Sequence, residues 1–441
     1  MGLSASRPAF AGATLGVATF VVYMIGSNRS FGYDAAASFA NFIATPSLWD
    51  AFAVRTVIPT IPVTQVATND HVLLSLISHV IFSVSGSRSE VVYRVVPALA
   101  GAATVGISTA VLSRRFGLLA GISAGLFLAT DPLFVDNSRD LRGYGLAALG
   151  SVAGTWILAG KWTRWRLVAY AVIMGLAISA QLFAAVVLLC HLAWIATRKS
   201  RPQIVGLLPA WVAAGLIGFA ANATIQVGEY VHHGLPPSYF FPTFPRDLVL
   251  FLLGAPVLLA LALWVPGAGL GMWTLRKAPW LWTTAGVVSL AVLVLWLVVQ
   301  PAFLYPRFFV FLVPALAYVM ASAIARWWVL APVVVLGAAA AVVGQAPGYT
   351  EDPLALPQAA AAVERIHSSG GRACLIHADE QILSGYTADF SVVTRAEQLA
   401  DCDAVVVLSW NVDLALRDKA AQDFPRLTTL KAYYPGVVLE R

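Results

Sequence analysis

The chain carries little charge for its size. Only 11% of its 441 residues are Asp, Glu, Lys or Arg, whereas 59% are hydrophobic and the mean hydropathy is +0.77. Soluble domains have about 25% charged residues. This chain therefore has too few polar residues to cover a soluble globule, and the same figures exclude a disordered or collagen-like protein. We expect most of its surface to be solvated by lipid.

Cysteine and phosphate-cradling glycine loops are also scarce. Of the three cysteines, Cys190 lies in an apolar run, and Cys374 and Cys402 could pair only if the C-terminal segment is exported. The glycines at Gly370 and Gly371 form a turn signal, not a dinucleotide fingerprint. The net charge of +6 would suit nucleic acid, but the basic residues cluster at the ends of apolar runs. We expect a lipid bilayer as partner and no nucleic acid.

Apolar runs long enough to cross a bilayer core of about 30 Å follow one another along the chain. The first of them is weakly basic on its flank and has no clear cleavage site, so we interpret it as a retained helix and not as a signal peptide. The run 167–197 is too long for one helix, and Ser179-Ala180-Gln181 near its middle predicts two short helices. Counted this way, the sequence predicts about 11 transmembrane helices, over 9–27, 92–113, 116–135, 144–160, 167–197 (as two), 203–221, 248–265, 281–299, 308–325 and 327–344.

The shorter run 71–85 has two interpretations, a twelfth span or a juxtamembrane helix at the interface. If it does not cross, the basic clusters between the other runs all face the cytoplasm, as the positive-inside rule requires. We therefore expect an external loop over 28–91 with juxtamembrane helices and a cytoplasmic N-terminus. The predicted domains are a multi-pass domain over 1–344 in the plasma (inner) membrane and an extracytoplasmic domain over 345–441.

The segment 345–441 has ordinary solubility. Helical periodicity at 356–367, 396–401 and 412–424 alternates with β-rich runs at 373–378, 391–394, 404–409, 427–434 and 437–440. Alternating elements of this kind predict a small α/β layer.

The expected orientation gathers acidic, His and Arg residues on the external face. Asp34 follows the first helix and could act as a general base or hold a metal; the alternatives are a solvated acid or an N-cap for a helix over 35–43. Arg139, Asp140 and Arg142 crowd the junction between two apolar runs, where charges are costly unless they are paired or functional. They could form an anion site, because Arg offers bidentate contacts to phosphate, or an Arg–Asp pair that closes the helix turn.

Other polar residues on this face give weaker signals. Arg307 lies at the external start of another predicted helix, where its side chain could bind an anion or snorkel to the membrane interface. Asp70 and His71, and separately Glu229 and His232, could contact substrate or ligate a divalent ion, since carboxylate and imidazole suit such metals. Neither group has a diagnostic metal spacing, and the alternative is that they are polar loop residues.

Seven segments follow one another along the chain: the loop acid Asp34, the juxtamembrane start Asp70-His71-Val72-Leu73-Leu74, Tyr93-Arg94-Val95-Val96-Pro97, Arg114-Arg115-Phe116-Gly117, Asp131-Pro132-Leu133-Phe134, Ser138-Arg139-Asp140-Leu141-Arg142-Gly143-Tyr144 and Pro306-Arg307-Phe308-Phe309. In this order, they resemble segments of the membrane glycosyltransferases of the GT-C fold, in particular the protein mannosyltransferase and lipid A aminoarabinose transferase group. Two positions depart from the family pattern: Ala35 stands where the family has the second acid of an Asp-Glu pair, and His71 is not followed by two prolines.

The resemblance implies an all-α polytopic enzyme that takes a sugar from a polyprenyl-phosphate donor at the outer face of the membrane. The acceptor would be a glycan, lipid or protein hydroxyl, which attacks the anomeric carbon with inversion. A divalent metal ion could take part, and no other cofactor is implied. Asp34 would be the general base with Asp140 as a second catalytic acid, and Arg139, Arg142, Arg307 and Tyr144 would hold the donor phosphate.

Two alternatives from other classes remain open. A transporter or flippase of lipid-linked sugars would place its site at the bilayer midplane, often within internal repeats. Here the mid-membrane stretches are almost free of ionisable residues, apart from His191, and no repeat is visible. A non-catalytic glycan-binding protein of the envelope would keep the external segments and tolerate the loss of Asp34.

Overall fold

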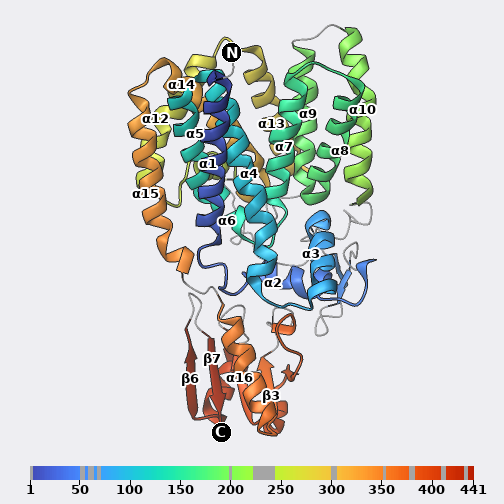
Figure 1. Ribbon diagram of the computed structural model, residues 1–441. Coiled ribbons are helices and arrows are strands. Elements are labelled where there is room, and N and C mark those ends of the chain that lie inside the picture. The colour runs from blue at the N-terminus through green and yellow to red at the C-terminus, as the bar shows by residue number, and fades with distance from the viewer. Residues whose placement is uncertain are drawn as a thin grey trace.

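The computed structural model describes residues 3–49, 55–57, 64–66, 71–197, 201–221, 244–298, 305–350, 354–376, 383–408, 414–431 and 436–441. A bundle of apolar helices forms one end of the molecule and a small α/β domain forms the other (Figure 1). Short elements from the segment after the first helix lie between the two. The bundle helices are α1 (Leu3–Met24), α4 (Glu90–Phe116), α5 (Leu118–Thr130), α6 (Pro132–Arg139), α7 (Tyr144–Ala159), α8 (Arg164–Ala180), α9 (Ala185–Ala196), α10 (Arg201–Ala221), α11 (Phe244–Leu252), α12 (Leu258–Leu275), α13 (Pro279–Val298), α14 (Val313–Arg326) and α15 (Leu330–Thr350).

The architecture is the polytopic helical fold that the sequence predicts. Within the described ranges, four helices are long and apolar enough to cross a membrane, over Glu90–Phe116, Leu258–Leu275, Pro306–Arg326 and Leu330–Tyr349, and the bent pair α5–α6 would make a fifth. Shorter apolar helices, α7 and α9 among them, complete the bundle. The number of spans, about 11, stays a prediction.

Small residues allow the first helix to pack closely on α4. A Cβ atom on Gly12 would lie 2.5 Å from the carbonyl oxygen of Gly106, and one on Gly106 would lie 2.9 Å from the carbonyl oxygen of Gly12. Close backbone approach through small residues is how helices associate where lipid removes the hydrophobic drive. The contact fixes α1, and with it the start of the external segment.

Two predicted single helices are broken in the structure. The run 116–135 bends by 60° between α5 and α6, because the Asp131 carboxylate accepts a hydrogen bond from Phe134 N (3.0 Å) and Pro132 starts the new helix. The run 248–265 breaks between α11 and α12, where Gly254 has a φ of 85°. The predicted break in 167–197 is confirmed: α8 ends at Ala180 and Gln181 caps the 3-10 turn η3 (Leu182–Ala184).

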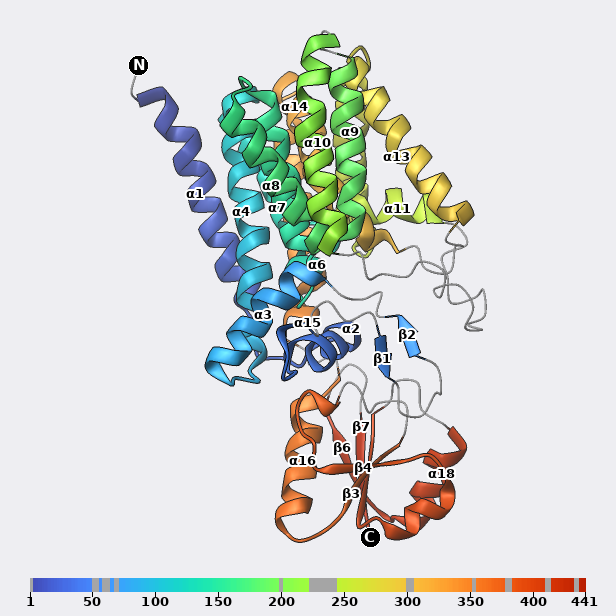
Figure 2. The ribbon, with the colours of Figure 1, turned by 90° about the vertical axis from the view of Figure 1, so that its right-hand side faces the viewer.

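The segment after α1 is held by a buried arginine. Arg94 on α4 donates hydrogen bonds to the carbonyl oxygens of Ser27 and Ser30, both at 2.7 Å, and to that of Arg29. The segment continues into α2 (Tyr33–Ser38) and the π-helical turn η1 (Phe39–Ile43), and later into the strands β1 (Arg55–Val57) and β2 (Thr64–Val66). The helix α3 (Val72–Ser85) packs against η1 at the end of the bundle (Figure 2), and its juxtamembrane location stays a prediction.

The C-terminal domain is the predicted α/β layer. Its five-stranded sheet has the order β4-β3-β5-β7-β6, with β3 parallel to β4 and β5, and β7 antiparallel to β5 and β6. A disulfide joins Cys374 on β3 to Cys402. The elements are α16 (Leu356–Ser368), β3 (Ala373–Ile376), β4 (Phe390–Val393), the 3-10 helix η9 (Ala396–Asp401), β5 (Ala404–Val407), α18 (Leu414–Asp423), β6 (Arg426–Leu430) and β7 (Gly436–Glu440).

This domain contacts the segment that carries Asp34. The Tyr386 hydroxyl accepts a hydrogen bond from Phe31 N (3.0 Å), and Arg88 donates one to the carbonyl oxygen of Gly385 (2.8 Å). Phe31 and Phe39 share one buried apolar cluster with residues of α16, β3 and β5. The start of α2 is therefore fixed from both sides, by Arg94 in the bundle and by Tyr386 in the C-terminal domain.

Candidate active site

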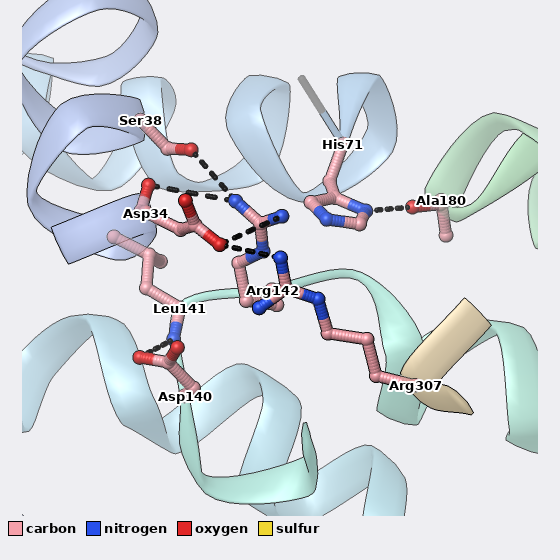
Figure 3. A network of polar contacts seen from close by, with 8 residues as sticks. All are labelled: Asp34, Ser38, His71, Asp140, Leu141, Arg142, Ala180 and Arg307. Atoms are coloured by element: carbon pink, nitrogen blue, oxygen red, sulfur yellow. Dashed lines mark hydrogen bonds and ion pairs between the residues drawn. The ribbon is translucent and has the colours of Figure 1, made fainter. Parts of the chain in front are cut away.

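Three charged residues from distant parts of the chain meet at the end of the bundle (Figure 3). Asp34 lies in the first turn of α2, Arg142 lies between α6 and α7, and Arg307 lies in the first turn of the 3-10 segment η7 (Pro306–Leu312). An Asp34 carboxylate oxygen is 2.7 Å from an Arg307 nitrogen and 3.8 Å from an Arg142 nitrogen. The ionic cluster Asp34–Arg142–Arg307 combines one anion with two cations and thus has a net positive charge.

The two arginines differ in their surroundings. The Arg142 side chain is 3% exposed, and it also approaches the carbonyl oxygen of Asp34 (3.4 Å) and the Ser38 hydroxyl (3.5 Å). The Arg307 side chain is 32% exposed and lies over the ring of Tyr305, whose centroid is 4.7 Å from the guanidinium carbon. Arg142 is therefore the buried anchor of the cluster, and Arg307 is its accessible cation.

The charges around Asp34 set its protonation. Burial alone would raise the pKa of Asp34, but the charges of Arg142 and Arg307 and the hydrogen bond from Arg307 outweigh it, so the pKa lies below its ordinary value. The carboxylate is thus ionised at neutral pH. Its side chain is 24% exposed, so a bound molecule can reach it.

His71 lies next to this cluster. Its Nδ1 is 2.8 Å from the carbonyl oxygen of Ala180, and its ring packs edge-on against Tyr144 with ring centroids 4.9 Å apart. The Ala180 carbonyl is available because α8 ends at this residue. The amide of Ala184, four residues later, donates to the carbonyl oxygen of Gln181 instead. A Cβ atom on Gly143 would lie 2.0 Å from the Ala180 oxygen, so only glycine allows this approach.

Arg139 and Asp140 lie outside the ionic cluster. Arg139 donates hydrogen bonds to the carbonyl oxygens of Tyr23 (3.0 Å) and Ile25, and its guanidinium lies 3.7 Å from the centroid of the Tyr349 ring. The Asp140 carboxylate accepts a hydrogen bond from Leu141 N at 2.9 Å (Figure 3). The structure thus brings together Asp34, Arg142, Arg307, Tyr144 and His71 from the predicted site residues.

The remaining predicted residues, Asp70, Glu229 and His232, lie outside the described residues. Within the part of the chain that the structure describes, no group of three or more His, Cys, Asp and Glu side chains could hold a metal ion. The divalent-ion hypothesis for Asp70, Glu229 and His232 stays a prediction.

The sequence alone does not distinguish Ser38, Tyr305 or Tyr386 as residues of the site or its surroundings. Ser38 lies one helical turn after Asp34, a spacing that places both side chains on one face of α2 and could have indicated it. Tyr305 stands two residues before Arg307. Tyr386 belongs to the C-terminal domain, and no local signal connects it with the first loop.

Comparison with known proteins gives a likeness of structure. No protein-family model and no curated protein sequence matches the chain. The solved structure of ArnT from Cupriavidus metallidurans in the apo state superposes with a TM-score of 0.61 over 97% of both chains at 15% identity, and the same protein bound to undecaprenyl phosphate does so with a TM-score of 0.56 over 97% of both chains at 15% identity.

A more distant likeness is to the oligosaccharyltransferase of Archaeoglobus fulgidus in complex with Zn and sulfate, with a TM-score of 0.51 over 89% of this chain and 67% of that one at 12% identity. The mycobacterial arabinofuranosyltransferase AftD has a TM-score of 0.50 at 15% identity; all of this chain aligns with 42% of AftD. These proteins are membrane glycosyltransferases of the GT-C type, so the expected GT-C fold is confirmed.

Proposed function

We propose that this chain is a membrane glycosyltransferase that moves a sugar from a polyprenyl-phosphate donor to an acceptor hydroxyl. The observation that carries the proposal is the ionic cluster Asp34–Arg142–Arg307 at one end of a GT-C bundle. Its net positive charge suits a phosphate, and its carboxylate suits the activation of a hydroxyl. The undecaprenyl phosphate bound by the structurally similar ArnT supports a carrier of this class.

Arg142 and Arg307 would bind the phosphate of the donor. Guanidinium groups match phosphate oxygens bidentately, and the exposed Arg307 could receive the phosphate while the buried Arg142 fixes its position. The same contacts would stabilise the charge that grows on the leaving polyprenyl phosphate when the glycosidic bond breaks.

Asp34 would act as the general base for the acceptor hydroxyl. In the unloaded site its two guanidinium neighbours lower its pKa, which makes it a weak base. A phosphate bound to the same guanidiniums adds a negative charge close to the carboxylate, and a neighbouring like charge raises a carboxyl pKa. Donor binding would therefore activate the base, and attack from the opposite face of the sugar would invert the anomeric centre.

We place the reaction on the extracytoplasmic side of the plasma membrane. The basic clusters between the apolar runs support this orientation. The Cys374–Cys402 disulfide of the C-terminal domain supports it as well, because disulfides persist in oxidising compartments.

A transfer assay tests the proposal. The purified full chain is given undecaprenyl phosphate that carries a radiolabelled sugar, with delipidated envelope glycan, envelope lipid or membrane protein as acceptor. We expect label in one acceptor fraction and release of undecaprenyl phosphate. A transporter or a glycan-binding protein would leave the donor intact, and an intact donor with all three fractions would contradict the proposal.

A further inference from the structure

Two buried polar atoms beside the ionic cluster have no hydrogen-bond partner among the described residues. They are Nε2 of His71 and the hydroxyl oxygen of Tyr144, on side chains of residues that are 6% and 1% exposed. Buried polar groups nearly always have partners, so each exception needs an explanation. Since the two rings pack edge-on at 4.9 Å, the two exceptions belong to one place.

The chemical character of His71 Nε2 follows from the other ring nitrogen. The Ala180 carbonyl can only accept, so His71 Nδ1 carries the hydrogen of their 2.8 Å bond. Burial, and after it the charge of Arg142, lower the pKa of His71 well below its ordinary value, so the ring is neutral. Nε2 is then a lone-pair acceptor, on the side of the ring that faces the guanidiniums of Arg142 and Arg307 (Figure 3).

An acceptor of this kind selects its ligand. It cannot bind phosphodiester oxygens, because these have no hydrogen to donate. An ammonium group could donate to it, but Arg142 and Arg307 already make the site positive, so a further cation is disfavoured. A neutral hydroxyl fits, and the Tyr144 hydroxyl, which can both donate and accept, can hold a second one.

The position of His71 and Tyr144 beside the ionic cluster indicates which ligand hydroxyls they would bind. A sugar is bonded through its anomeric carbon to the phosphate, so a phosphate on Arg142 and Arg307 brings the ring hydroxyls of the donor sugar next to the cluster. We propose that His71 Nε2 and the Tyr144 hydroxyl form the subsite for these hydroxyls and select an uncharged, hydroxylated sugar over an amino sugar. This inference rests on the proposed function. His71 is a binding residue here and not a base, since protonation would put a third cation beside the two arginines.

Two conservative variants separate this role from a structural one. In His71→Asn the side-chain amide can still donate to the Ala180 carbonyl, but the acceptor at the Nε2 position is gone. Tyr144→Phe keeps the ring that packs against His71 and removes only the hydroxyl. Arg307→Gln serves as the matched variant of the phosphate subsite.

Binding of short-chain polyprenyl phosphate tests the proposal, with the phosphate either bare or linked to glucose, mannose, galactose, arabinose or 4-amino-arabinose. For the wild-type chain we expect the bare phosphate to bind and a neutral sugar to increase affinity more than the amino sugar. His71→Asn and Tyr144→Phe should reduce the gain from the neutral sugar about tenfold and leave affinity for the bare phosphate unchanged. Arg307→Gln should weaken binding of every ligand.

The outcomes separate the two proposals. If the gain from sugar survives in both variants, if no neutral sugar gives a gain, or if the amino sugar gives the largest one, the sugar subsite is wrong while the phosphate subsite stands. If the bare phosphate does not bind the wild-type chain, the proposed function itself fails.

Discussion

The carboxylate of Asp34 lies 2.7 Å from the guanidinium of Arg307 and joins α2, near the start of the chain, to η7, which precedes α14 late in the bundle. Arg142 approaches the same carboxylate oxygen from the α6–α7 junction at 3.8 Å. The candidate site therefore exists only in the folded chain, and each of its three charges can be tested separately.

Removal of the Asp34 charge should separate catalysis from binding. In Asp34→Asn we expect sugar transfer to fall by about 10²–10⁴, the usual contribution of a positioned base. Affinity for undecaprenyl phosphate should be retained or increase, because Asn no longer competes with the phosphate for Arg142 and Arg307. Transfer rates and equilibrium binding on the same preparation check this, and unchanged transfer would rule out the base.

Asp140 provides the matched comparison for Asp34. Its carboxylate bonds to Leu141 N, whereas Arg142 and Arg307 are ion-paired with Asp34. We therefore expect Asp140→Asn to transfer sugar within a few-fold of the wild-type rate. A loss as large as that of Asp34→Asn would show that both acids take part in the reaction, as the sequence alone suggested.

Arg307 and Arg139 should control different properties: Arg307 the affinity for the donor phosphate, and Arg139 the stability of the fold. Loss of a charge-assisted hydrogen bond costs about 1.5–3 kcal/mol, so Arg307→Gln should weaken undecaprenyl phosphate binding roughly 10- to 150-fold. Arg139→Gln should instead lower the thermal stability, since that guanidinium bonds the Tyr23 and Ile25 carbonyl oxygens at the end of α1. Binding isotherms and melting curves of both variants check the division, and an equal loss of affinity in Arg139→Gln would contradict it.

The pH dependence of transfer should report the pKa of Asp34. The active base is the ionised carboxylate, so kcat/KM falls as the pH drops through the pKa of the unloaded enzyme, which the two arginines hold below its ordinary value. Arg307→Gln removes one of the two charges and should move this acid limb to higher pH by roughly 1 unit. Rates relative to the plateau, measured in both proteins, check the shift; Arg276→Gln, on the loop after α12, is the control that should not shift it.

The disulfide allows a test of orientation. Cys374 and Cys402 are bonded in the C-terminal domain, and Cys190 is free and buried in the bundle. In intact cells of a Cys190→Ser strain, a membrane-impermeant maleimide should label the chain only after reduction by an impermeant phosphine. Labelling that requires lysis of the cells would reverse the orientation.

The sequence predicted the elements of the fold better than their geometry. Hydropathy and periodicity identified most of the apolar helices and the strands of the C-terminal sheet, since both signals are local. They overlooked the 60° bend at Asp131, although an acid followed by proline is an N-terminal helix signal, because a hydropathy average is insensitive to one capping residue.

The sequence could supply a set of candidate site residues but not which of them contact one another. Arg139 and Arg142 are three residues apart, and the sequence favours both equally as phosphate-binding residues. The end of α6 at Arg139 turns one guanidinium toward α1 and leaves the other to meet Asp34. Which of two neighbouring arginines is structural depends on tertiary contacts with Tyr23, Tyr349 and α2, and no local pattern contains them.

The most direct test of the central claim is the structure of the full chain with undecaprenyl phosphate in a lipid nanodisc. We predict density for the phosphate within hydrogen-bond distance of both Arg142 and Arg307, with the isoprenoid chain leaving along the bundle into lipid. Phosphate density elsewhere, for example beside Arg7 at the other end of α1, with the Asp34–Arg307 ion pair undisturbed, would contradict it.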